Sequence, residues 1–183
     1  MRFFKTQSAI QGLSKEDLAR VREAAKAIQD APLSPIQACF YDIVVLALNT
    51  GLRRSELLNL RWRNVKDESL EIKGKGGKFR TVPLNKAAKE VIMKQPRRAE
   101  FVFDVPNRNN ATVQHNTTKR VSRMADVDFH LHLLRHAFNS RLLEKGVDIV
   151  TLGAILGHSK TSISLIYTHT DEERKRKAVD LLL

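Results

Sequence analysis

The sequence predicts a mainly α-helical domain with one small antiparallel β-sheet, an α+β fold class. Apolar residues recur at helical spacing over most of the chain, and short extended segments lie between residues 61 and 83. A glycine-rich turn at residues 74–78 joins two of these segments and predicts a β-hairpin. With 183 residues, 42% of them hydrophobic and 28% charged, the chain can bury a core and is typical of a globular protein.

The N-terminal half is expected to supply the central helix of the core. Ser14 begins a capping box ahead of a first helix, and Pro32 ends that helix. Residues 36–49 are apolar on almost every side, which predicts a buried helix at the centre of the fold. Gly51 ends this helix, and a short helix follows over residues 53–60.

The extended segments predict the sheet. Residues 69–73 and 79–83 are the two strands of the hairpin, and residues 61–65 are a candidate third strand. The turn between the hairpin strands is no nucleotide-binding loop, because it lacks the P-loop pattern and leads into a strand.

The C-terminal half is expected to be helical again. Helices are predicted over residues 85–95, 112–125, 131–145, 148–156, 161–167 and 171–183. In the third of these, Leu134, Phe138, Leu142 and Leu143 are expected to face the core.

The charge of the chain favours a polyanionic partner. Thirty-two Lys and Arg residues against twenty Asp and Glu residues give a formal net charge of +12. A basic solvated surface is the plainer interpretation, but neutralising phosphates would release counterions and drive binding to nucleic acid. No apolar run approaches the roughly 18 residues that a membrane span needs. The lone Cys39 excludes an internal disulfide and fits a reducing compartment.

Polar and reactive side chains interrupt the helical pattern between His132 and Tyr167. A tyrosine near the end of an amphipathic helix is usually a core anchor, but its phenol can attack a phosphodiester if cations bind the phosphate. Arg135 lies beside apolar neighbours, so its guanidinium needs an anion, either a protein carboxylate or a substrate phosphate. His132 lies one helical turn earlier, on the same face as Arg135.

Further candidates have plainer alternatives. Arg53 begins a helix and can pair with Glu56 three residues later, and the neighbouring Arg54 competes with Arg53 for a functional role. His158 could be only a helix C-cap, and Lys75 only a soluble hairpin tip.

The histidines also permit a metal interpretation. His132 and His136 have metal-ligand spacing, with His130 close by, but no carboxylate or thiol nearby in the sequence completes a site. A metal site is therefore disfavoured.

The order of these residues resembles the tyrosine recombinase (phage integrase) family over about residues 35–170. The matching segments are Thr50-Gly51-Leu52-Arg53-Arg54-Ser55-Glu56-Leu57, Gly74-Lys75-Gly76 before Arg80-Thr81-Val82-Pro83-Leu84, His132-Leu133-Leu134-Arg135-His136, Leu156-Gly157-His158 and Tyr167-Thr168-His169. The resemblance implies that family's catalytic-domain fold, and it selects Arg53 over Arg54 because Arg53 directly follows Thr-Gly-x.

The resemblance implies a site-specific recombinase that cuts and rejoins duplex DNA through a 3′-phosphotyrosine link to Tyr167. The rivals are a nicking-closing enzyme similar to type IB topoisomerases, a DNA-binding protein without the reaction, and a metal-dependent hydrolase. The implied catalytic residues are Arg53, Lys75, His132, Arg135, His158 and Tyr167. The two arginines would bind the scissile phosphate, Lys75 would protonate the leaving 5′ oxygen, His132 would assist proton transfer, and His158 would hydrogen-bond the phosphate. Neither metal nor cofactor is implied.

The resemblance also sets expectations for organisation and partners. Residues 1–34 would be an N-terminal lead-in and helix, residues 35–170 the catalytic domain, and residues 171–183 a C-terminal helical tail. A separate core-binding domain is absent, which indicates a fragment or truncated form, the alternative being a naturally short member. The expected partner is double-stranded DNA, with a homotetramer on recombination sites, a monomer when free, and no membrane. The expected location is the cytoplasm, on DNA, of a bacterial or phage-encoded protein.

Two details are specific to this chain. Leu133 stands where the family often has Asp, so a supporting hydrogen bond is expected to be missing. The tail joins the basic run 174–177 to an apolar end, and it either folds onto its own domain or docks onto a neighbouring protomer.

Overall fold

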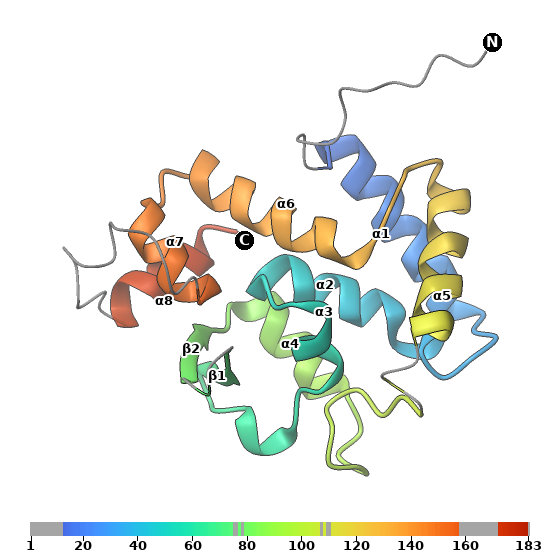
Figure 1. The fold of residues 1–183 in the computed structure, drawn as a ribbon, viewed down its shortest axis with the longest axis horizontal. Coiled ribbons are helices and arrows are strands. Elements are labelled where there is room, and N and C mark those ends of the chain that lie inside the picture. Colours follow the sequence, from blue (N-terminus) through green and yellow to red (C-terminus); the bar gives the residue numbers. More distant parts are fainter. Residues whose placement is uncertain are drawn as a thin grey trace.

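A computed structural model describes residues 13–74, 77, 79–106, 108, 111–157 and 172–182 of the chain. Within these residues the chain is mainly helical, with a two-stranded sheet at one side of the molecule (Figure 1), and this agrees with the predicted fold class. The elements are α1 (Lys15–Asp30), η1 (Gln37–Cys39), α2 (Phe40–Thr50), α3 (Arg54–Leu58), η2 (Trp62–Asn64), β1 (Ser69–Lys73), β2 (Phe79–Pro83), α4 (Lys86–Lys94), α5 (Ala111–Ala125), α6 (Leu131–Glu144), α7 (Ile149–Leu156) and α8 (Glu172–Asp180). None of the helices in these ranges is long and apolar enough to cross a membrane.

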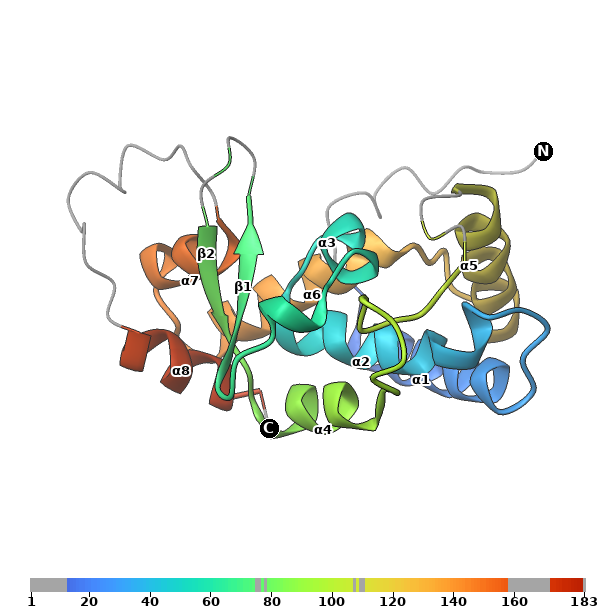
Figure 2. The ribbon, with the colours of Figure 1, turned by 90° about the horizontal axis from the view of Figure 1, so that it is seen from below.

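Helix α2 is the centre of the core. Every side chain from Asp42 to Thr50 is buried, which confirms the predicted central helix, although a 3-10 turn precedes it. Helices α1, α4 and α6 pack against α2, and Figure 2 shows α3 and α4 on opposite sides of it. The predicted capping box of α1 is confirmed, because the Ser14 hydroxyl accepts a hydrogen bond from the Asp17 amide at 3.0 Å.

Helix α6 carries the site residues over the core. Leu134, Phe138 and Leu142 are fully buried, as predicted. The prediction for Leu143 is wrong, since its side chain is 45% exposed. Each helical residue turns about 100°, so a residue directly after Leu142 lies beside the apolar stripe and outside it.

The hairpin forms with the predicted strands. Ser69 to Lys73 pairs antiparallel with Pro83 to Phe79, and Leu70 lies opposite Val82. The third strand expected at residues 61–65 is not formed. The chain there makes the turn η2 with single bridges at either side, because the Asn64 and Val65 amides donate to carbonyls three residues back and not to a neighbouring strand.

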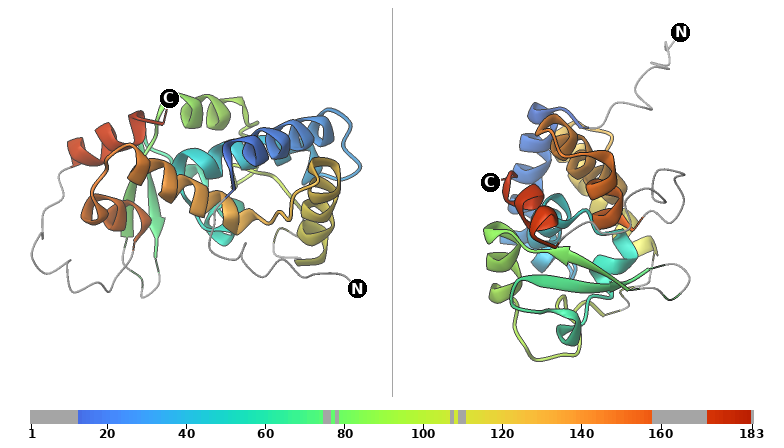
Figure 3. Two further views of the ribbon diagram at one scale, coloured as in Figure 1. Left: turned by 90° about the horizontal axis from the view of Figure 1, so that it is seen from above. Right: turned by 90° about the vertical axis from the view of Figure 1, so that its left-hand side faces the viewer.

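Helix α8 packs onto α7 and β2 of its own chain, as Figure 3 shows from two sides. Ala178, Val179 and Leu182 are buried in the same hydrophobic cluster as α1 and α2. The predicted C-terminal helix is thus observed over Glu172–Asp180. The helix predicted at residues 161–167 lies outside the described residues.

Candidate active site

The buried guanidinium of Arg135 joins three helices. It extends from α6, is 6% exposed, and donates from Nη1 to the Gly51 carbonyl at 2.6 Å and from Nη2 to the Leu156 carbonyl at 2.9 Å. These carbonyls lie at the C-terminal ends of α2 and α7, where helix carbonyls lack intrahelical donors and carry partial negative charge. The sequence predicted an anion as the partner of Arg135. In these two contacts its partners are carbonyl groups at helix C-termini.

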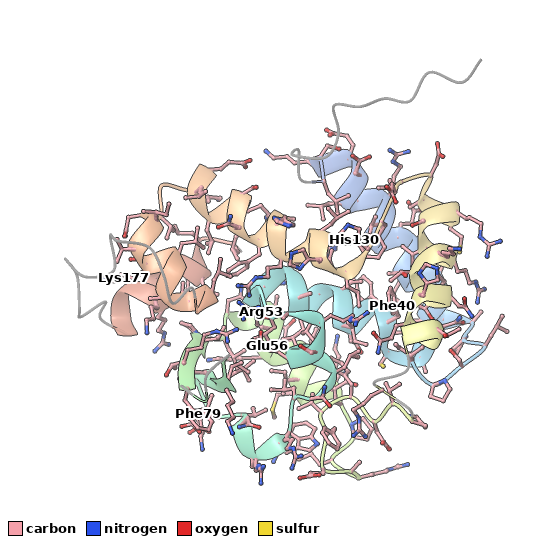
Figure 4. The ribbon with its side chains drawn as sticks, in the orientation of Figure 1. Phe40, Arg53, Glu56, Phe79, His130 and Lys177 are labelled. Carbon is pink, nitrogen blue, oxygen red and sulfur yellow. The ribbon has the colours of Figure 1, made fainter. Side chains whose placement is uncertain are left out.

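Arg53 is held at the start of α3 by Glu56. Its main-chain amide donates to Glu56 Oε2 at 2.8 Å and its Nη1 donates to Oε1 at 3.0 Å, which confirms the predicted pairing. The Arg53 side chain is 40% exposed and that of Glu56 is 10% exposed, so the cation reaches solvent while its partner is buried. Figure 4 places Arg53 and Glu56 next to each other near the middle of the molecule.

Arg80 lies in the hairpin motif of the resemblance, but no role was predicted for it from the sequence. From β2 it donates to both oxygens of Glu56, Nη1 to Oε1 at 2.9 Å and Nη2 to Oε2 at 2.8 Å, while Nε donates to the Ile155 carbonyl at 3.0 Å. A signal was present, since alternation along a strand puts Arg80 on the same face as the buried Val82. An arginine on an apolar strand face requires a partner.

The electrostatics of these groups are coupled. Burial alone would raise the pKa of Glu56, but hydrogen bonds from Arg80 and Arg53 outweigh it, so the pKa is lowered and the carboxylate is ionised at neutral pH. Burial, followed by the charge of Arg53, lowers the pKa of Arg135 to about 10, against an opposing effect of Glu56. The guanidinium groups of Arg53, Arg80 and Arg135 thus all interact electrostatically with the Glu56 carboxylate. The positive charge of these arginines exceeds the negative charge of Glu56, which favours binding of an anion.

His132 lies beside these cations, on the exposed surface of α6. Its ring packs edge-on against His136 with centroids 4.7 Å apart and parallel to His130 at 6.4 Å. Partial burial, then the charges of His136, Arg135, His130 and Arg53, lower the pKa of His132, so the neutral imidazole dominates at pH 7. Within the described ranges, no three His, Cys, Asp or Glu side chains are grouped so that they could hold a metal ion.

The structure brings together three of the six predicted site residues. Arg135 donates to the Gly51 carbonyl two residues before Arg53, and His132 lies one helical turn before Arg135 on α6. Lys75, His158 and Tyr167 lie outside the described residues.

Comparison with known proteins identifies the family. The model of the phage integrase family matches residues 13–174. The chain belongs to the phage integrase family. Among curated members it is 34% identical over 172 residues to tyrosine recombinase XerC of Caldanaerobacter subterraneus subsp. tengcongensis, covering 86% of this chain and 49% of the relative. It is also 34% identical over 150 residues to tyrosine recombinase XerA of Pyrococcus furiosus, covering 75% and 52%. The chain thus spans about half the length of these relatives.

Solved structures confirm the phage integrase fold. The integrase of mycobacterium phage Brujita superposes with a TM-score of 0.72 at 24% identity, over 100% of this chain and 61% of that chain. The catalytic domain of bacteriophage HP1 integrase gives a TM-score of 0.64 at 24% identity, over 92% of each chain. The predicted catalytic-domain fold of the tyrosine recombinases is therefore confirmed.

Proposed function

We propose that this chain is the catalytic domain of a site-specific tyrosine recombinase, which cuts and rejoins duplex DNA through a 3′-phosphotyrosine intermediate. The observation that carries the proposal is the position of Arg53, paired with Glu56, two residues after the Gly51 carbonyl that accepts from Arg135, with His132 one helical turn before Arg135. Fixed cations in a partly buried site stabilise the charge of a pentacoordinate phosphorus. The curated relatives are named tyrosine recombinases, which supports the same chemistry.

The reaction is a transesterification in which each group has one task. The Tyr167 phenolate oxygen forms a bond to the scissile phosphorus, and the bond from phosphorus to the 5′ oxygen breaks. Lys75 gives its proton to that leaving oxygen, while His132 assists removal of the phenol proton. Arg53 and Arg135 neutralise the non-bridging oxygens, and His158 donates a hydrogen bond to the phosphate. The phosphotyrosine bond keeps the energy of the broken ester, so religation requires no ATP.

The neutral state of His132 suits its proposed role. The positive charges of Arg135 and Arg53 contribute to lowering its pKa, so at pH 7 the ring has a lone pair available to accept a proton. Binding of a phosphate diester adds a negative charge that opposes these cations. We therefore expect the pKa of His132 to rise when DNA binds. The protonated imidazole can then return the proton to the oxygen of Tyr167 during religation.

The partner in this proposal is double-stranded DNA. A net charge of +12 favours a polyanion, and a related solved structure is XerH bound to its difH substrate. We further propose that the chain is a monomer when free, that a homotetramer performs strand exchange on two sites, and that residues 35–170 carry the reaction. We also propose that the protein acts on DNA in the cytoplasm.

A nicked suicide duplex tests the proposal. After cleavage beside the nick, a short 5′-hydroxyl fragment diffuses away, so a covalent protein–DNA adduct accumulates on a denaturing gel. We expect the adduct in the presence of EDTA, since the cations are side chains. Failure to form an adduct on the chain's own recombination site would contradict the proposal. Joining of strands from two sites, as opposed to relaxation of supercoils alone, separates a recombinase from a topoisomerase-like enzyme.

A further inference from the structure

We infer that Arg80 is a positioning residue for the proposed reaction, which couples the β-hairpin to Arg53 and to the end of α7. The inference rests on the proposed function for its kinetic consequence, but its structural part stands on contacts alone. Arg80 lies on β2, and its partners lie on α3 and α7. One side chain thus connects three elements that are separate in the sequence.

The contact between Arg80 and Glu56 is geometrically rigid. Two parallel N–H donors meet two carboxylate oxygens at 2.9 and 2.8 Å, the bidentate arrangement that a planar guanidinium favours. The side chains of Arg80 and Glu56 are 9% and 10% exposed, so water screens the pair little. The carboxylate of Glu56 is therefore fixed in orientation by the hairpin.

Each oxygen of Glu56 accepts one donor from Arg80 and one from Arg53. Oε1 accepts Nη1 of both arginines, while Oε2 accepts Nη2 of Arg80 and the main-chain amide of Arg53. A rotation of the carboxylate would move both contacts of Arg53 at once. Arg80 consequently positions the backbone and the guanidinium of Arg53 through Glu56.

The third donor of Arg80 binds the end of α7. Nε donates to the Ile155 carbonyl, and the next carbonyl, of Leu156, accepts from Arg135. Gly157 leaves space for this arrangement, because a Cβ there would lie 2.8 Å from Cδ of Arg80, and the residue has a φ of +70°. The segment that follows Gly157 contains His158 and Tyr167. Arg80 and Arg135 together fix the point from which that segment starts.

The test compares Arg80→Gln and Arg80→Lys with wild type. Arg80→Gln removes the guanidinium that makes the bidentate contact with Glu56. Arg80→Lys keeps one positive charge near Glu56, so this variant should retain part of the cleavage rate that Arg80→Gln loses. We expect single-turnover adduct formation to fall about tenfold or more in Arg80→Gln, while the Kd for duplex DNA changes less than about threefold. Arg176→Gln is the matched control, since it breaks an exposed ion pair with Glu68 away from the site.

A double-mutant cycle separates positioning from general destabilisation. If Arg80 acts through Arg53, adding Arg80→Gln to Arg53→Ala should reduce the rate by much less than Arg80→Gln does alone. Additive losses, a wild-type rate in Arg80→Gln, or the same loss in Arg176→Gln would overturn the inference. If Arg80→Gln does not fold, the same cycle is run with Arg80→Lys.

A second measurement does not depend on catalysis. Nitrogen-15 spectra of the arginine side chains should show a shifted Arg53 Nε signal in Arg80→Gln, and hydrogen exchange should accelerate at the Gly157 amide, which donates to Gly153. An unchanged Arg53 signal would overturn the inference. If wild type forms no adduct but these changes occur, the proposed function fails while the positioning of Arg53 by Arg80 stands.

Discussion

The guanidinium of Arg135 donates to the carbonyl of Gly51 at 2.6 Å, across 84 residues of sequence. Gly51 ends α2 with a φ of +63°, and a Cβ at this position would lie 2.5 Å from the Phe138 ring and 2.9 Å from Leu156. The close approach of α2, α6 and α7 at this point therefore requires glycine. It is this approach that brings Arg135 to two helix C-termini at once.

Substitution of Gly51 by alanine should destabilise the fold strongly. The strained φ and the clash with Phe138 together should cost about 3 kcal/mol, which lowers Tm by roughly 6–12 °C for a chain of this size. Gly146→Ala is the control, because Gly146 also has a positive φ, +81°, but a Cβ there meets no atom within 4 Å. Equal losses of Tm in the two variants would contradict the packing argument.

Removal of the Arg135 side chain should abolish cleavage and also reduce stability. Arg135→Ala leaves the Gly51 and Leu156 carbonyls without this donor in a buried site, at a cost of about 2 kcal/mol. DNA binding should be largely retained, because phosphate contacts are spread over a basic surface. Arg141→Ala on the same helix, which loses one contact to the Leu182 carbonyl, should leave the cleavage rate per folded molecule unchanged. Parallel loss of binding and cleavage in Arg135→Ala would indicate a structural role alone.

The pKa of His132 should be sensitive to the positive charges of Arg135 and Arg53. Its pKa is below the ordinary 6.5, so the folded protein resists protonation there. As the pH falls below about 6.5, His132 becomes protonated in the unfolded chain before it does in the folded protein. Over this pH range, His132 therefore lowers the free energy of unfolding, and the loss is complete once the pH is below the pKa of the folded state. By NMR, Arg53→Gln should raise the pKa of His132, and duplex DNA should raise it too. Arg176→Gln should leave it as in wild type, and a fall in pKa on DNA binding would contradict the proposed proton transfer.

Helix α8 should stabilise its own domain. Val179 is fully buried, so Val179→Ala should lower the free energy of unfolding by about 2 kcal/mol, whereas Leu181→Ala, at a side chain 44% exposed, should change it by less than about 0.5 kcal/mol. Thermal unfolding at two protein concentrations checks both values. A tail that docked only onto a neighbouring protomer would leave the Tm of a dilute Val179→Ala monomer at the wild-type value. Deletion of residues 178–183 then tests whether self-association on DNA needs the tail.

Local patterns were enough to predict much of this fold. The apolar run of α2, the glycine-rich turn of the hairpin and the Arg53–Glu56 pairing all depend on residues within a few positions of one another. Two predictions were wrong for local reasons. Residues 61–65 contain a 3-10 turn in place of a strand, and Leu143 lies at the edge of the apolar stripe of α6.

The partners of Arg80 and Arg135 could not be predicted in this way. Both guanidinium groups bind carbonyls at the end of α7, 75 and 21 residues away, and carbonyl groups leave no signature in a sequence. Only the packing of β2, α6 and α7 brings these groups together. Arg80 could be recognised as unusual from strand alternation, but its contact with Glu56 could not.

The attacking residue is the central claim, and mapping the attachment site of the DNA tests it most directly. The chain has two tyrosines, and Tyr41 on α2 serves as the control because its hydroxyl accepts a hydrogen bond from Arg22 at 3.4 Å, within α1–α2 packing. After the suicide reaction, nuclease trimming and proteolysis, mass spectrometry should find the residual nucleotide on Tyr167. The adduct should disappear in Tyr167→Phe and persist in Tyr41→Phe. A nucleotide on any other residue, or an adduct that survives Tyr167→Phe, would contradict the account.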